Sequence, residues 1–329
     1  MVSPILLSVV IPTLNRSDLL RETLSRILIH YPVGDPRIEF IVVDNASDVE
    51  VEPLINDFYS SFCNTLHCVR FENRVDIVSS FKRCVQSAKG AFVQIFGDDD
   101  LPCGLVGYQL LNSISSHNPR LIYLNRFIGD EYLESAGEIA HPNDVSKSIF
   151  SMPLSDFIDC YNHWPCFITS LVFSRFAWES GLKVNSKEYP GFTFLDFLFR
   201  SPEIDTVLVF GEPSIIQRRG SQSWKKYWPL YWYLGCSKLL SDLDSDGISK
   251  SSLKTWLSNE IKIKNLIVDL LIAKSYPSVY DKQFWRYIRN LFSHSFLLSA
   301  VVYLISLLPS SVCFSLLKLS PNKSKYGLT

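Results

Sequence analysis

Three consecutive carboxylates, Asp98-Asp99-Asp100, follow an apolar segment, residues 91–96, that has the length and composition of a buried strand. Gly97 separates the predicted strand from the acids. Three adjacent carboxylates repel one another and need a positive partner, for which a divalent cation is the usual solution. The alternative is a solvated acidic turn, and the rest of the chain must decide between these two interpretations.

The elements that would position these acids alternate in type along the first hundred residues. Apolar strands are predicted at residues 7–11, 38–43, 67–71 and 91–96, with amphipathic helices between them. The strands are apolar throughout, as expected for strands covered on both faces. With right-handed crossovers, this order predicts an α/β fold with a mostly parallel, doubly wound sheet.

Two further polar loops follow predicted strands in the same way. Pro12-Thr13-Leu14-Asn15-Arg16 follows the first strand, and Asp44-Asn45-Ala46-Ser47-Asp48 follows the second. Ligands of doubly wound sheets bind beyond the carboxyl ends of the strands. We therefore expect the acidic turn and these two loops to form one shared site.

Composition limits the classes of function. Hydrophobic residues make up 47% of the 329 residues, which is typical of a globular chain. The net charge of -1 argues against a nucleic-acid partner bound through phosphate neutralisation. None of the eight cysteines forms a Cys-x-x-Cys pair, and no signal peptide is visible, so a reducing cytoplasm is expected.

Glycine-rich phosphate loops are absent from the sequence. No Gly-x-Gly-x-x-Gly follows the first strand, and no Gly-x-x-x-x-Gly-Lys-Ser/Thr occurs anywhere. Neither a dinucleotide dehydrogenase nor a P-loop enzyme is favoured. A nucleotide can still bind if a metal ion holds its phosphates, which is the chemistry that the three acids suggest.

The order and spacing of these motifs resemble the family 2 glycosyltransferases over about the first 125 residues. The segments that carry the resemblance are residues 8–16, 41–48 and 88–100. The resemblance implies a GT-A fold, that is, a Rossmann-like nucleotide-sugar domain. It also implies Mg²⁺ or Mn²⁺ on Asp98 and Asp100, an inverting reaction, and a nucleotide diphosphate sugar donor. The residues that it implies for donor binding are Pro12, Thr13, Asn15, Arg16, Asp44, Asn45, Arg74, Asp98 and Asp99.

One departure from the family pattern lies before the third helix. The family commonly has Asn-x-Gly-x-x-x-Asn, whereas this chain has Val75 in place of the glycine and Ser80 in place of the second asparagine. Arg74 in this segment either reaches the nucleotide or is a solvated arginine.

Asp196 is the first candidate for the general base, because it is a lone acid in an aromatic and aliphatic stretch, residues 189–199. Desolvation raises the pKa of such a carboxyl, which suits a group that takes a proton from a sugar hydroxyl. The alternative is a helix acid that faces solvent or pairs with Arg200 at i+4. Glu188, just before a Pro-Gly turn, is the second candidate.

Segments 167–178, 189–197 and 218–224 resemble a narrower group, the abequosyltransferase-type enzymes of bacterial O-antigen assembly. This resemblance implies a lipid-linked oligosaccharide acceptor. Arg218 and Arg219 would neutralise the leaving diphosphate, and Trp224 would contact the acceptor. Alternatively, each arginine is a surface cation without a role in the site. The aromatic stretch that begins at Trp224 can alternatively be a helix that packs on the sheet.

The C-terminal third is predicted to be helical and rich in aromatic residues. The apolar run 296–308 is shorter than the roughly 20 residues that a membrane span needs, and Pro309 follows it. We expect a helical hairpin that lies on an anionic membrane surface. The basic residues expected to face the lipid are Arg286, Arg289, Lys318, Lys323 and Lys325. The alternative is a buried pair of helices.

Together these features predict three regions: a nucleotide-sugar half (1–125), an acceptor half (126–222) and a helical, membrane-associating region (223–329). The predicted function is metal-dependent transfer of a sugar to a lipid-linked glycan of a surface polysaccharide, at the inner face of the cell membrane. Two alternatives remain open, a sugar nucleotidyltransferase and a non-catalytic glycan-binding protein.

Overall fold

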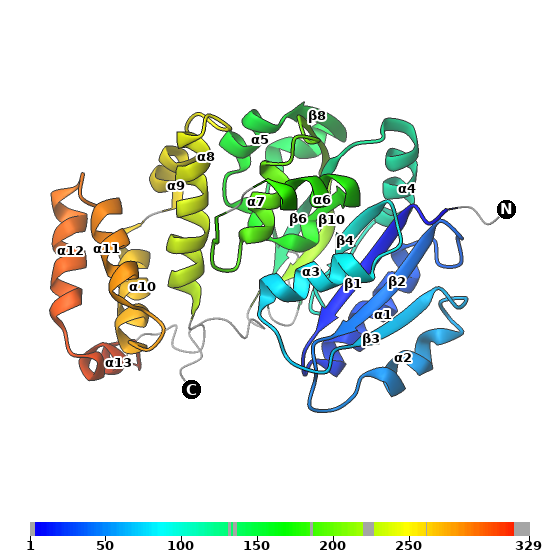
Figure 1. The fold of residues 1–329 in the computed structure, drawn as a ribbon, viewed down its shortest axis with the longest axis horizontal. Coiled ribbons are helices and arrows are strands. Elements are labelled where there is room, and N and C mark those ends of the chain that lie inside the picture. Colours follow the sequence, from blue (N-terminus) through cyan, green and yellow to red (C-terminus); the bar gives the residue numbers. More distant parts are fainter. Residues whose placement is uncertain are drawn as a thin grey trace. The chain divides into compact units, whose positions relative to one another are not determined.

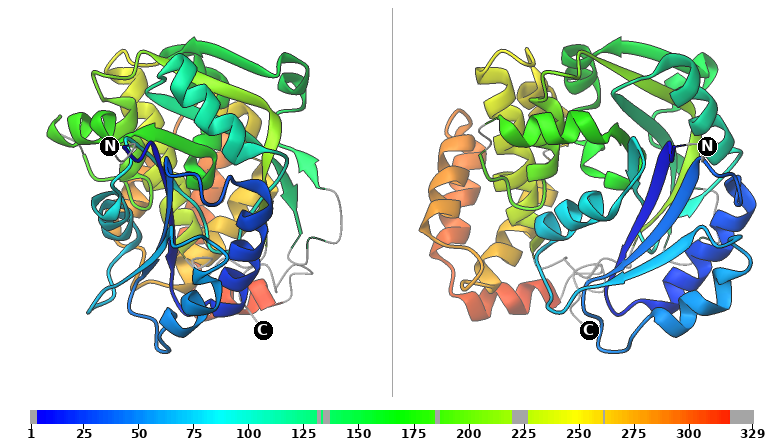
Figure 2. Two further views of the ribbon diagram at one scale, coloured as in Figure 1. Left: turned by 90° about the vertical axis from the view of Figure 1, so that its right-hand side faces the viewer. Right: turned by 45° about the vertical axis from the view of Figure 1, so that its right-hand side comes forward.

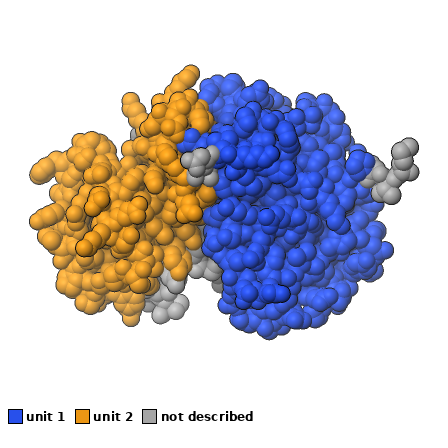
Figure 3. Space-filling view, viewed as in Figure 1, with its two compact units in different colours: residues 1–157, 164–186, 194–221 blue, residues 158–163, 187–193, 222–329 orange. Residues whose placement is uncertain are grey.

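The computed structural model describes residues 4–130, 133, 137–184, 187–219, 227–260 and 262–318. The chain forms two compact units (Figure 3). The sheet unit comprises residues 1–157, 164–186 and 194–221, and the helical unit comprises residues 158–163, 187–193 and 222–329. Trp224, the predicted acceptor contact, lies outside the described residues.

The strands of the sheet unit form one ten-stranded sheet (Figure 1). They are β1 (Leu7–Thr13), β2 (Ile38–Asp44), β3 (Leu66–Arg70), β4 (Phe92–Ile95), β5 (Leu101–Pro102), β6 (Leu121–Gly129), β7 (Glu138–Ile139), β8 (Ile149–Pro153), β9 (Leu171–Ser174) and β10 (Thr206–Arg218).

The central path of the sheet runs β3-β2-β1-β4-β9-β6-β10-β5. β3, β2, β1 and β4 are parallel to one another, as are β6 and β10, while β9 lies antiparallel between β4 and β6. In the β1–β2 register Thr13 pairs with Asp44, so both strands end at the same level. The loops that follow them therefore start from the same edge.

Helices precede or follow most strands of the sheet unit. They are α1 (Ser17–His30), α2 (Glu52–Tyr59), α3 (Ile77–Ser87), α4 (Val106–His117), α5 (Leu154–Tyr161), α6 (Arg175–Lys183) and α7 (Thr193–Phe199), with short 3₁₀ helices at Pro142–Lys147, Trp164–Cys166 and Ile168–Ser170. The last of these 3₁₀ helices comes directly before β9, which begins at Leu171.

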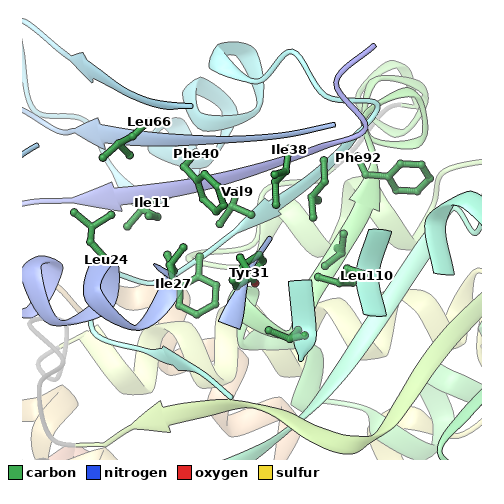
Figure 4. Close-up of a cluster of buried hydrophobic side chains, with 14 of the residues drawn as sticks. Val9, Ile11, Leu24, Ile27, Tyr31, Ile38, Phe40, Leu66, Phe92 and Leu110 are labelled. Carbon is green, nitrogen blue, oxygen red and sulfur yellow. The ribbon is translucent and has the colours of Figure 1, made fainter. Parts of the chain in front are cut away.

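The main core lies between one face of the sheet and helices α1, α2 and α4. Val9 and Ile11 of β1 and Phe40 of β2 point to the same face, because side chains alternate along a strand. Leu24 and Ile27 of α1 pack on them at helical spacing (Figure 4). α3 lies on the opposite face of the sheet (Figure 2). The parallel strands are thus covered on both sides, as their apolar sequence predicts.

The helical unit contains a π-helix at Leu230–Ser237, followed by α8 (Lys238–Ser245), α9 (Ser252–Glu260), α10 (Ile263–Ser275), α11 (Lys282–Leu291), α12 (Phe296–Leu307) and α13 (Ser310–Lys318). Among the described residues, no single helix has both the length and the apolar character that a membrane crossing requires. α12 and α13 meet those criteria only as a pair, and the pair is bent by 110°.

Candidate active site

The first two polar loops are in direct contact at the carboxyl edge of the sheet. Asn15 has a left-handed backbone, with a φ of 57°, which turns the chain between β1 and α1. Its side-chain amide donates to Asp48 at 2.7 Å and accepts from the backbone N–H of Asp48, also at 2.7 Å. The backbone N–H of Asn15 donates to the Ser47 hydroxyl at 2.9 Å. The expectation that these loops share one edge is confirmed.

Asp44 lies at the end of β2 and is fully buried. Its carboxylate accepts from the Ser47 backbone N–H at 2.9 Å and pairs with the Arg70 guanidinium. Both carboxylate oxygens are therefore engaged in holding the loop.

The segment before α3, residues 74–75, forms hydrogen bonds with the second polar loop. Asn45 donates to the carbonyl of Val75 and accepts from its N–H, both at 3.0 Å. Arg74 donates to the carbonyl of Ala46 at 3.1 Å and forms an ion pair with Asp48. Thus, although Val75 replaces the family glycine, the segment still reaches the loop, and Arg74 lies beside it.

The acidic turn is tied to the first loop through Asp98. The Thr13 hydroxyl donates to Asp98 Oδ2 at 2.7 Å, and Arg16 Nη1 donates to Asp98 Oδ1 at 3.0 Å. The same Arg16 nitrogen lies 3.1 Å from Asp99 Oδ2. Arg16 therefore bridges two of the three acids. Pro12, also predicted to contact the donor, is the half-buried sixth residue of β1.

Asp100 has different partners. Its carboxylate accepts from the Thr169 hydroxyl at 2.6 Å and from the backbone N–H of Arg218 at 3.4 Å. The Arg218 side chain continues past it, donating to the carbonyl of Asp99 at 3.1 Å and to Glu22 at 2.6 Å. Arg218, at the end of β10, is therefore a buried part of the site and not a surface cation. Arg219 is exposed.

Thr169, Thr23 and Glu22 belong to this site but were not anticipated from the sequence. Thr23, fully buried on α1, has its hydroxyl 2.9 Å from the carbonyl of Asp98 and 3.0 Å from that of Asp100. The available signal was its position, because a threonine on the otherwise apolar buried face of a helix needs a hydrogen-bond partner.

Burial dominates the electrostatics of the acidic turn. It raises the pKa of Asp98 to about 6, against the opposing effect of Arg16, and the Asp99 charge adds to the increase. Burial and the Asp99 charge also raise the pKa of Asp100, while the Thr169 hydrogen bond acts in the opposite direction. These carboxyls are therefore desolvated and crowded, and additional positive charge would favour their ionised forms.

The donor groups of the acidic turn determine whether it can hold a metal ion. Within the described residues, no three His, Cys, Asp or Glu side chains form a group able to hold a metal ion. However, Asp98 and Asp99 both place a carboxylate oxygen on Arg16. Mg²⁺ commonly uses one or two carboxylates together with substrate phosphates. The two acids thus fit a metal that arrives with a diphosphate, and they do not form a complete site for a metal alone.

A second buried cation, Arg126 on β6, lies in the sheet unit near the turn. Its guanidinium is held by the Tyr123 hydroxyl at 3.1 Å and by the Gln217 side-chain oxygen at 2.9 Å, and it lies over the Phe167 ring at 4.4 Å. None of these groups is charged. Burial raises the pKa of Asp100, and the positive charge of Arg126 acts through space against that rise.

Asp196, the predicted base, is fully buried on α7. Its Oδ1 accepts from Arg200 Nε at 2.6 Å, so the i+4 ion pair given above as the alternative is present. A base role for Asp196 stays a prediction. Glu188, the second candidate, is exposed and belongs to the helical unit.

A comparison with protein families decides the identity of the chain. The model described as "Glycosyl transferase family 2" matches residues 8–176, more than half of the 329 residues. The chain belongs to glycosyl transferase family 2. The matched segment of this family 2 member contains the first two polar loops, the acidic turn and Thr169. A comparison with curated proteins finds no match.

Solved structures with a similar fold include S. aureus TarS. TarS 1-349 in complex with UDP-GlcNAc superposes with a TM-score of 0.59 at 13% identity, over 91% of this chain and 89% of that one. The same fragment in complex with UDP gives a TM-score of 0.55, with the same identity and coverage. At this identity the likeness concerns the fold alone. It confirms the predicted GT-A fold, with a mostly parallel central sheet and a helical C-terminal region.

Proposed function

We propose that this family 2 glycosyltransferase transfers a sugar from a nucleotide diphosphate donor to a lipid-linked glycan during synthesis of a surface polysaccharide such as O-antigen. The proposal rests on the contacts among three loops at the carboxyl edge of the sheet. Arg16 of the first loop contacts Asp98 and Asp99 of the acidic turn. Asn15 of the first loop contacts Asp48 of the second. Donors of doubly wound folds bind at this edge. The UDP-GlcNAc complex of TarS, a protein of similar fold, supports a nucleotide-sugar donor.

In this proposal the loops bind different parts of the donor. Pro12, Thr13, Asn15, Asp44, Asn45 and Arg74 contact the nucleotide. Arg218, beside Asp99 and Asp100, neutralises charge on the leaving diphosphate, and the exposed Arg219 supports it. Asp196 takes the proton from the acceptor hydroxyl, which requires its pair with Arg200 to open. The reaction inverts the anomeric centre.

The resemblance implies Asp98 and Asp100 as the residues that would hold Mn²⁺ or Mg²⁺. In this proposal Asp99 takes the place of Asp100, because the Asp100 carboxylate accepts from the Thr169 hydroxyl and from the backbone N–H of Arg218. When bound, the metal supplies Lewis-acid stabilisation of charge on the diphosphate. The contribution of the chain is to present these carboxylates in a desolvated turn, anchored by Thr13 and by Thr23.

An anionic membrane surface is the partner that we propose for the helical unit. Seven exposed large apolar side chains lie on α12 and α13: Phe296, Leu297, Tyr303, Leu304, Leu307, Val312 and Leu316. α12 contains no charged residue, whereas the neighbouring α11 exposes Lys282, Arg286 and Arg289. Apolar surface with basic residues close by suits the membrane interface. This surface supports a peripheral location on the inner membrane face and a lipid-linked acceptor.

The test is release of nucleoside diphosphate from UDP-, GDP-, CDP- and dTDP-sugars, with Mn²⁺ and with a lipid-linked oligosaccharide extract as acceptor. The wild type is expected to release one of these diphosphates. Sugar phosphate together with a nucleoside triphosphate should not be consumed, and consumption would favour the nucleotidyltransferase alternative. Binding of glycan with no release from any donor would favour the non-catalytic alternative.

A further inference from the structure

Arg16 lies where a cation is expected in the acidic turn. A single guanidinium nitrogen, Nη1, lies 3.0 Å from Asp98 Oδ1 and 3.1 Å from Asp99 Oδ2. The side chain is only 21% exposed, and the two carboxylates are less exposed still. Partly buried ion pairs are screened less by salt than exposed ones, so this bridge is a strong local interaction.

The backbone of Arg16 is held independently of the bridge. Asn15, the preceding residue, is fixed by Ser47 and Asp48, and Arg16 itself is the N-cap residue of α1. The loop therefore stays in place if the guanidinium leaves the acids. The movable part is the side chain alone, which has several rotatable bonds.

The rest of the turn does not complete a metal site around Asp98 and Asp99. Asp100 is engaged by Thr169 and by the backbone N–H of Arg218. No group of three metal-ligating side chains exists within the described residues. A divalent ion entering without other ligands would have to displace Arg16 and would gain only the carboxylates of Asp98 and Asp99.

We propose that Arg16 occupies the cation position between Asp98 and Asp99 until the donor binds, so that the divalent metal binds only together with the nucleoside diphosphate. This inference rests on the proposed function. The diphosphate supplies oxygen partners to both cations, the metal ion and the Arg16 guanidinium. Its oxygens complete the metal coordination, and its charge offers the Arg16 guanidinium a bidentate anionic partner in place of the two carboxylates. Arg16 is thus a positioning residue that couples metal binding to donor binding.

The test is Mn²⁺ binding followed by electron paramagnetic resonance, because the signal of hydrated Mn²⁺ falls as the ion binds. Wild type, R16Q and the control R21Q are titrated with Mn²⁺ alone and then with UDP, GDP, CDP or dTDP. Arg21 lies on the same helix and pairs with Asp57 at the surface. We expect Mn²⁺ alone to bind R16Q at least 10-fold more tightly than wild type or R21Q. Added diphosphate should tighten Mn²⁺ binding to wild type at least 10-fold, and less in R16Q.

If wild type and R16Q bind Mn²⁺ equally well while diphosphate still binds, the proposed role of Arg16 is overturned and the proposed function is not. Failure of all four diphosphates to bind would instead overturn the proposed function. If R16Q lacks a melting transition, R16K replaces it, because an ammonium cannot reproduce the guanidinium geometry and Mn²⁺ affinity should again rise. Unchanged Mn²⁺ affinity of R16K would then count against the proposal.

Discussion

The hydroxyl of Thr169 donates to the carboxylate of Asp100 at 2.6 Å, joining two residues that lie 69 positions apart in the chain. The same hydroxyl accepts from the backbone N–H of Gly97 at 3.0 Å. Thr169 therefore holds both ends of the acidic turn. It does so from a 3₁₀ helix that precedes β9, the antiparallel strand between the two parallel parts of the sheet.

Replacing Thr169 with Val should lower the free energy of unfolding by about 1–3 kcal/mol, because a buried carboxyl loses a hydrogen-bond donor. The nearly isosteric side chain keeps the packing volume. Urea unfolding of T169V measures the loss, and T169S, which keeps the hydroxyl, should stay near wild type. Equal stability of T169V and wild type would show that the bond does not hold the turn.

Asp196 and Arg200 form an ion pair with a fully buried carboxylate, so breaking either half should lower the melting temperature. We expect D196N and R200Q to be destabilised similarly, by several degrees. If Asp196 is also the base, only D196N should lose turnover by about 100-fold or more at a temperature where both variants are folded. A comparable loss of turnover in the two variants would assign Asp196 a structural role only, and E188Q would then test the second candidate.

Asp269 on α10 gives the helical unit a pH dependence. Burial raises the pKa of Asp269 to about 7, and the hydrogen bond from Tyr233 opposes this rise. In the unfolded chain the pKa of an Asp is about 3.9. Between these values the folded protein retains a proton that the unfolded chain has released, so stability falls as pH rises from about 4 to about 7. D269N still accepts the Tyr233 hydroxyl and should be more stable than wild type at pH 8, by about 1 kcal/mol or more.

Urea unfolding at pH 4, 6 and 8 follows this difference between D269N and wild type. At pH 4 the two proteins should differ least, since Asp269 is protonated in the folded wild type. A constant difference at all three pH values would contradict the assignment to Asp269.

The apolar surface of α12 should determine membrane binding. Leu304 and Leu307 are 62% and 63% exposed, and transferring their exposed surface out of water stabilises by about 1–2 kcal/mol each. The double substitution L304S/L307S should therefore reduce co-sedimentation with phosphatidylglycerol vesicles at least 10-fold. I29S, which changes an equally exposed residue on α1, is the matched control.

Salt should weaken the vesicle binding, because it screens the attraction between the exposed basic residues of α11 and the anionic lipid. At about 0.1 M salt this attraction extends over only about 10 Å. If the double variant co-sediments as well as wild type, α12 is not the docking surface. If wild type sediments equally without vesicles, its apolar surface binds a second copy of the chain instead.

The sheet and the meeting of the three loops were predictable because their signals are local. Each apolar run ends directly before a polar loop, and parallel pairing then brings those loops to one edge. The pairing of Thr13 with Asp44 in the β1–β2 register and the contact of Thr13 with Asp98 follow from that rule.

The second half of the site was not predictable in the same way. Thr169 contacts Asp100 only because β9 lies beside β4, an antiparallel pairing that no local pattern in the sequence indicates. The spacing of Asp196 and Arg200 indicated an ion pair, but their depth of burial depends on the packing of α7. Local spacing thus predicts which side chains can meet and leaves open how deeply they lie.

Isothermal titration of nucleoside diphosphates in the presence of Mn²⁺, on wild type and on D99N, shows whether the acidic turn binds the donor diphosphate. Asp99 is the most exposed of the two acids on Arg16, and its change to Asn removes charge while keeping size. We expect one of UDP, GDP, CDP or dTDP to bind wild type, and D99N, with an unchanged melting temperature, to bind it at least 10-fold more weakly. Equal binding by D99N, or no binding of any diphosphate to wild type, would contradict this expectation.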